Sequence, residues 1–191
     1  KARGALQGRA EAHDWRELTA VILLSVTTIL TAWSGFQASK WGGAMSISFS
    51  QASAARIEAV GLDGDANRKI SVQVSLFTQW LQANASRNTE VADYLAARFP
   101  EPLMSAFTAW QKTDPATNPG APSSPFVMNE YVVPEQTAAE AANRRADELF
   151  SQALEANQRG DNYTILTVDF ASVLFFAAIS GRMKSLHYQW V

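Results

Sequence analysis

Two long segments almost free of charge constrain the fold of this chain more than any other feature. The first, from Leu18 to Ser39, contains no charged residue, and the second, from Tyr163 to Gly181, contains only Asp169. A helix of about 20 residues matches the roughly 30 Å hydrocarbon core of a bilayer. We therefore predict membrane-spanning helices over 18–41 and 163–181. A pair of buried helices in a soluble bundle, or a cleaved signal peptide, fits the lengths less well.

Large aromatic residues flank both segments. Such residues are enriched where a membrane meets water, because their rings are apolar and their polar atoms face the headgroups. We predict five interfacial anchors, namely Trp15 and Trp41 around the first segment and Tyr163, Tyr188 and Trp190 around the second.

The basic residues near the segments predict an orientation. Lys1, Arg3, Arg9 and Arg16 precede the first segment, and Arg182 and Lys184 follow the second. Basic residues next to spanning helices favour the cytoplasmic side. We therefore expect 1–17 and 182–191 to be cytoplasmic. The central part, 42–162, carries 9 basic and 14 acidic residues and should face the periplasm.

The central part has helical periodicity, and none of its stretches shows a convincing strand pattern. One predicted helix carries a stripe of Ile70, Val74, Phe77 and Leu81, and "GLDGD" (61–65) should separate it from the helix before. Asn88 or Thr89 should cap a third helix, and Pro102 should begin a fourth. The fold class predicted is all-α, with two transmembrane helices flanking an extracytoplasmic helical bundle.

A proline-rich arm, 114–134, follows these helices, with five prolines in 21 residues. Its aromatic residues, Phe126 and Tyr131, predict an arm that lies on the surface of a partner. A last exposed helix, Glu135 to Gln158, should end at "RGDN", before the second membrane segment.

Residue types that carry chemistry are scarce. The chain has no cysteine, and its two histidines, His13 and His187, lie near opposite ends of the sequence. No nucleotide-binding motif occurs, and a net charge of −2 with scattered basic residues argues against nucleic-acid binding. We expect no enzyme activity, no metal and no cofactor.

Small residues recur along the first segment at alternating intervals of three and four. Such a stripe lets helices approach closely in a membrane, where packing and hydrogen bonds hold them together. Ala171, Ala178 and Gly181 offer a partly matching face on the second segment. The stripe comprises Ser25, Thr28, Ala32, Gly35, Ser39 and Gly42.

Asp169 is the residue that fits its segment least. An ionised carboxylate within a bilayer costs about 3 kcal/mol on insertion scales, so we expect it to face protein or water. Ser172 shares its helix face. We interpret Asp169 as a hydrogen-bonding group that fixes helix pairing, and a proton or ion pathway is the alternative.

The chain resembles a family of uncharacterised bacterial inner-membrane proteins. The resemblance lies in "TAWSGFQASKW", "LFTQWLQA", the arm "NPGAPSSPF" and "EANQRGDNYTILTVDFASVLFFAAISGR". It implies a bacterial cytoplasmic membrane and, in many relatives, further apolar helices after the equivalent of Arg182. Either a C-terminal part is missing after Val191, or this member is shorter. The resemblance transfers no catalytic residue.

These observations favour a non-catalytic subunit that packs against other membrane proteins and lipid. An accessory subunit of a respiratory or photosynthetic complex would fit, and a homo-oligomer stays open. The alternative is an extracytoplasmic sensor domain whose output module is missing from this chain.

Overall fold

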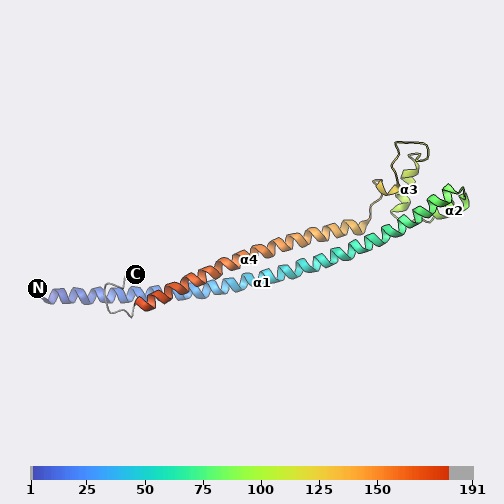
Figure 1. Ribbon diagram of the computed structural model, residues 1–191. Coiled ribbons are helices and arrows are strands. Elements are labelled where there is room, and N and C mark those ends of the chain that lie inside the picture. The colour runs from blue at the N-terminus through green and yellow to red at the C-terminus, as the bar shows by residue number, and fades with distance from the viewer. Residues whose placement is uncertain (1, 181–191) are drawn as a thin grey trace. The chain divides into compact units, whose positions relative to one another are not determined.

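The computed structural model describes residues 2–180, with side chains for Trp15 and for most residues from 17 to 179. Its elements are α1 (Ala2–Ala85), α2 (Thr89–Ala96), α3 (Leu103–Gln111), the 3₁₀ helix η1 (Pro125–Val127) and α4 (Pro134–Ser180) (Figure 1). The described residues contain no strand, so the all-α prediction is confirmed. The chain divides into two compact units. The first unit is Lys1–Gln51 with Leu149–Val191, and the second is Ala52–Glu148.

The predicted break at "GLDGD" is wrong, because Gly61 and Gly64 lie inside α1. A glycine within a helix costs only about 1 kcal/mol relative to alanine. Ala59 and Ala66, on the neighbouring turns, are fully buried. Packing of the turns on either side therefore keeps the chain helical at Gly61 and Gly64.

The predicted end of the last exposed helix at "RGDN" is also wrong. Residues 159–162 are helical, and α4 continues from Pro134 to Ser180 without interruption. Gly160 is buried, and a Cβ placed on it would lie 3.6 Å from the Trp41 Cβ of α1. The glycine thus sits at a close helix contact rather than at a turn.

In the first unit, α1 and α4 lie side by side and bury residues spaced three and four apart (Figure 1). This spacing is that of a left-handed pair of coiled helices. We call these residues the seam. On α1 it comprises Leu24, Thr27, Thr31, Ser34, Ala38, Trp41, Met45 and Ser48. On α4 it comprises Leu149, Ala153, Ala156, Gly160, Tyr163, Thr167, Phe170, Leu174 and Ala177.

The second unit uses the same spacing with alanine as its main residue. Ala55 and Ala59 of α1 and Ala139 and Ala146 of α4 are almost completely buried. Beside them, Arg56 donates hydrogen bonds to Asn143 (2.9 Å) and Asp147 (2.6 Å). Because alanine side chains are short, the two helix backbones can approach closely in this unit.

An aromatic core occupies the rest of the second unit. Trp80 of α1 packs edge-on against Phe107 of α3 at 4.9 Å between ring centroids, and Phe99 meets Phe107 at 5.1 Å. Trp110 donates its indole N–H to the Pro122 carbonyl oxygen at 2.7 Å. Offset and edge-on ring pairs at these separations are favourable. The core joins α1, α3 and the proline-rich arm.

The helices around this core begin where the sequence places them. Asn88 Oδ1 accepts a hydrogen bond from the Val91 N–H, which confirms the predicted cap of α2. Arg87, at φ 57°, reverses the chain between α1 and α2. Helix α3 begins at Leu103, one residue after Pro102. On α1, however, Val74 and Leu81 are each 42% exposed, so only part of the predicted stripe faces the core.

Candidate functional site

The two apolar segments lie on helices that are long and apolar enough to cross a membrane. In the most apolar stretch of α1, 11% of the residues are buried, and in that of α4 the share is 0%. Large apolar side chains point outward, such as Ile29 (68% exposed) and Phe176 (65% exposed). This arrangement differs from a core helix of a soluble protein, whose apolar side chains are mostly buried.

The seam between the segments combines polar and small side chains with larger apolar ones such as Leu24 and Phe170. Thr27 and Ser34 are the buried polar residues of this part of α1. Thr31 donates its hydroxyl to the Thr27 carbonyl oxygen at 2.7 Å, and Thr167 donates to the Tyr163 carbonyl oxygen at 2.9 Å. The hydroxyl groups of Thr31 and Thr167 are therefore satisfied within their own helices, which lets them face another helix without an unpaired donor.

The small-residue stripe lies beside the seam rather than in it. Its first five members, Ser25 to Ser39, are exposed, and Gly42 is half-buried. A Cβ on Gly35 would meet no atom within 4 Å. Ala171 and Ala178 are exposed as well, so α1 and α4 do not use the matching face that the sequence suggested. Contact of the stripe with a helix of another chain stays a prediction.

Asp169 is exposed on α4, next to the seam residue Phe170. Ser172 is exposed too and donates its hydroxyl to the Val168 carbonyl oxygen of its own helix at 2.9 Å. In the described residues neither side chain hydrogen-bonds to α1. If Asp169 fixes helix pairing, the partner is not α1.

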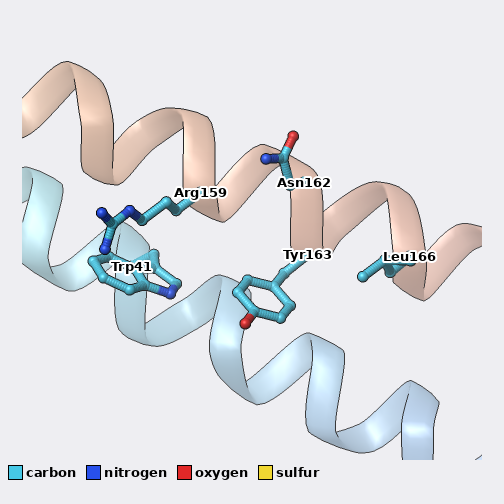
Figure 2. Close-up of a pocket in the computed structure, with 5 residues that line it drawn as sticks. All are labelled: Trp41, Arg159, Asn162, Tyr163 and Leu166. Carbon is cyan, nitrogen blue, oxygen red and sulfur yellow. The ribbon is translucent and has the colours of Figure 1, made fainter.

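Two of the predicted anchors come together at one pocket of the first unit. Trp41 of α1 and Tyr163 of α4 line it with Arg159, Asn162 and Leu166, and its volume is about 390 Å³ (Figure 2). The Arg159 guanidinium lies over the Trp41 ring, 4.7 Å from its centroid. Sequence periodicity did not indicate Arg159, because it belongs to a part of α4 that we expected to be a turn.

Of the other three predicted anchors, the structure describes only Trp15. Trp15 is 71% exposed on α1. Tyr188 and Trp190 lie outside the described residues, as does the end of the second segment at Gly181. Their anchoring role stays a prediction.

The proline-rich arm lies on the chain's own aromatic core. Phe126 and Tyr131 are half-buried against that core, with 5.0 Å between their ring centroids. The surface beneath them therefore belongs to this chain, and contact with a partner through these two rings stays a prediction. Their neighbours Val127 (62% exposed) and Val132 (57% exposed) are more accessible.

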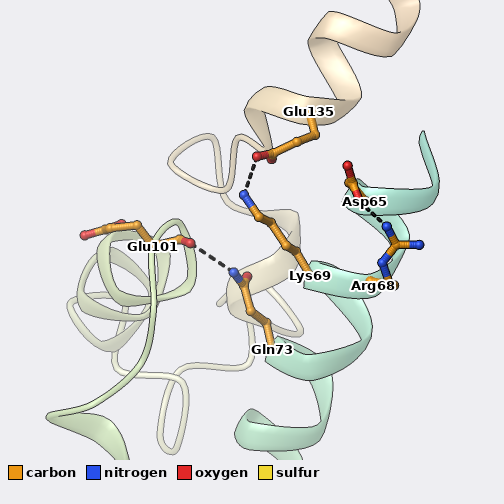
Figure 3. Close-up of polar contacts among 6 residues, drawn as sticks. All are labelled: Asp65, Arg68, Lys69, Gln73, Glu101 and Glu135. Atoms are coloured by element: carbon orange, nitrogen blue, oxygen red, sulfur yellow. Dashed lines mark hydrogen bonds and ion pairs between the residues drawn. The ribbon is translucent and has the colours of Figure 1, made fainter. Parts of the chain in front are cut away.

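Polar contacts connect the start of α4 to α1 within the second unit (Figure 3). Lys69 pairs with Glu135, and Gln73 donates its side-chain N–H to the Glu101 carbonyl oxygen at 3.0 Å. The hydrogen bond from Lys69, with one from the backbone, lowers the pKa of the Glu135 carboxyl below its usual 4.5. Burial raises the pKa of the Tyr131 hydroxyl. The Lys69–Glu135 pair connects α1 to the start of α4, and the Gln73–Glu101 hydrogen bond connects α1 to the loop before α3.

Among the described residues, no three His, Cys, Asp or Glu side chains are grouped so that they could hold a metal ion. His187 lies outside that range. The site that the structure builds is therefore the outer surface of the apolar helix pair together with the Trp41–Arg159 pocket.

No protein-family model matches the chain, and neither the curated proteins nor the solved structures contain a match to it.

Proposed function

We propose that this chain is an integral membrane protein that spans the bilayer twice and acts as a non-catalytic accessory subunit of a larger membrane complex. The observation that carries the proposal is the distribution of side chains on the helix pair of the first unit. The seam combines hydroxyl and small side chains with a few large apolar ones such as Leu24 and Phe170, while most large apolar side chains of the two segments face outward. Exposing so much apolar surface to water is unfavourable, whereas a bilayer accommodates it.

Two exposed features of the same helices favour a protein partner in addition to lipid. The stripe from Ser25 to Ser39 exposes small side chains, and open space surrounds Gly35. A second helix could approach closely there. Asp169 exposes a carboxylate in an apolar segment, and such a residue favours contact with protein or water over lipid. A subunit with these features would pack against further membrane helices.

The proposed location is the bacterial inner membrane, with both termini in the cytoplasm and 42–162 in the periplasm. The excess of basic residues outside this stretch supports the orientation. The second unit would then form the periplasmic part. Its aromatic core and ion pairs are those of a water-exposed helical unit.

The test of the partner is purification from the native membrane in mild detergent, with identification of the proteins retained. We expect Gly35→Leu to lose them, because a leucine side chain on the stripe prevents close approach. Gly43→Leu is the matched control, since its Cβ also has open space but it lies outside the stripe. Retention of every partner by Gly35→Leu would contradict the proposed contact.

Variants of Asp169 can be purified and compared in the same way. Asp169→Asn should keep the complex, because the amide retains hydrogen-bonding capacity, while Asp169→Leu should weaken it. If Asp169→Asn abolishes the activity of the complex and leaves its composition intact, a proton pathway replaces the packing role. Loss of neither partner nor activity in Asp169→Leu would mean that the side chain faces water.

A further inference from the structure

The Trp41–Arg159 pocket lies where α4 changes from a polar to an apolar helix. The stretch from Glu148 to Asp161 contains four charged residues with both ends included, whereas Asp169 alone is charged from Tyr163 to Ile179. The pocket follows this change, with Arg159 and Asn162 first and Leu166 about 10 Å further along the helix (Figure 2). Its lining thus passes from a cation and an amide to an aliphatic side chain within two turns.

The Arg159 guanidinium is held in place and retains donors for a ligand. Its position over the indole of Trp41 is a cation–π contact, which favours a fixed orientation. A guanidinium has five N–H donors, and Glu155 accepts one hydrogen bond from it at 3.2 Å. The planar group matches the geometry of phosphate oxygens, which it can bind through two parallel hydrogen bonds.

Tyr163 and Trp41 lie between the polar and apolar ends. Both are half-buried, and both side chains combine an apolar ring with a polar atom. Such side chains are typical of the boundary between headgroups and acyl chains. A ligand that fits this order carries an anionic group at one end and a hydrocarbon chain at the other.

We propose that this pocket binds the headgroup phosphate of a phospholipid. Arg159 donates hydrogen bonds to the phosphate, Trp41 and Tyr163 flank the glycerol, and an acyl chain lies along Leu166 (Figure 2). The inference rests on the proposed insertion of the first unit into a membrane. A free phosphate ester would have the same contacts with Arg159 but would gain nothing from Leu166.

The experiment is native mass spectrometry of the full chain in detergent, with three probes of matched chemistry. Phosphatidylglycerol carries both phosphate and acyl chains, diacylglycerol lacks the phosphate, and glycerol 3-phosphate lacks the chains. We expect phosphatidylglycerol to be retained about tenfold better than diacylglycerol, as for a hydrogen bond to a charged group. Glycerol 3-phosphate at equal concentration should not displace it.

Substitutions at Arg159 test whether the lipid binds in this pocket. Arg159→Gln should lower retention of phosphatidylglycerol about tenfold, and Arg159→Lys should lower it less, because the charge remains without the planar fork. Arg145→Gln is the control, since Arg145 is an exposed arginine of α4 outside the pocket. Circular dichroism should show equal helix content for all three. If Arg159→Gln misfolds, Arg159→Lys tests the same phosphate and should still lower retention.

Two results would overturn the inference. One is equal retention of phosphatidylglycerol by the wild-type chain and by folded Arg159→Gln. The other is displacement of the lipid by glycerol 3-phosphate, which would assign the pocket to a soluble phosphate ester. Carbonate extraction of membranes shows whether such a result contradicts the lipid site alone or the proposed membrane location as well. Release of the wild-type chain from membranes contradicts the membrane proposal, whereas retention combined with either result contradicts the lipid site alone.

Discussion

Glu135 lies in the first turn of α4 and forms an ion pair with Lys69 of α1. This ion pair connects the two helices within the second unit. Its lowered pKa, due first to the hydrogen bond from Lys69, makes this contact dependent on pH. A carboxyl with a lowered pKa in the folded state stabilises that state above its unfolded pKa. The contribution is therefore complete above about pH 4.5 and is lost as the pH falls through the lowered value.

We predict that Glu135→Gln lowers the midpoint of thermal unfolding at pH 7 and that the difference from wild type shrinks progressively below pH 4.5. Circular dichroism at a series of pH values measures it. Glu140→Gln, on an exposed position of the same helix, should change the midpoint little at any pH. A constant difference between Glu135→Gln and wild type from pH 7 to pH 3 would show that the ion pair is not its source.

Individual residues also show which part of a helix contact can be read from a sequence. The small residues of the first segment recur at alternating intervals of three and four, and the seam with α4 has the same spacing. The contact with α4, however, uses Thr27, Thr31 and Ser34, one residue before Thr28, Ala32 and Gly35. Both series are small and have the same spacing, so periodicity alone could not identify the one that faces α4. In a membrane helix, hydropathy does not settle the choice either, because lipid and protein surfaces are both apolar.

At the scale of the elements, the packing of α1 against α4 depends on short side chains. Gly160 is the clearest case, because a Cβ there would lie 3.6 Å from the Trp41 Cβ and 3.7 Å from the Ala38 carbonyl oxygen. These are ordinary contact distances. Gly160→Ala should therefore be tolerated and should stabilise the helix by up to about 1 kcal/mol.

A larger side chain at the same position should have the opposite effect. We predict that Gly160→Leu destabilises the chain by about 2 kcal/mol, since overpacking forces the helices apart. Thermal unfolding in detergent, followed by circular dichroism, compares both variants with wild type. Gly43→Leu, whose Cβ would have open space, is the control and should not destabilise. Equal stability of Gly160→Leu and wild type would mean that α1 and α4 are not in close contact here.

The existence of the helices could be predicted, but their lengths could not. Asn88 and Pro102 correctly indicated the starts of α2 and α3, because capping and fixed backbone geometry act locally. "GLDGD" and "RGDN" looked like breaks for the same local reasons. Burial of Ala59, Ala66 and Gly160 outweighs the cost of those glycines. For Gly160 the neighbouring atoms belong to Ala38 and Trp41, about 120 positions away in the sequence. The Trp41–Arg159 pocket was missed for that reason, although both of its aromatic residues had been identified as anchors.

For the whole molecule, the central prediction is that the apolar helix pair lies in lipid and the second unit in the periplasm. The two apolar stretches follow and precede stretches rich in basic residues, and 42–162 between them is acidic overall. Basic residues near spanning segments are retained in the cytoplasm, while long loops cross largely regardless of charge. We therefore predict that the two ends of α1 lie on opposite sides of the membrane.

Single cysteines can test this topology cleanly, because the chain has none of its own. Ser86→Cys and Ser123→Cys occupy exposed positions of the second unit and should react with a membrane-impermeant maleimide in intact spheroplasts. Ser172→Cys lies in the second apolar segment and should stay unlabelled before and after lysis, since lipid excludes the reagent. Labelling of Ser86→Cys and Ser123→Cys only after lysis would invert the topology. Rapid labelling of Ser172→Cys in intact membranes would instead place the helix pair in water, and its exposed apolar surface would then need a soluble partner to cover it.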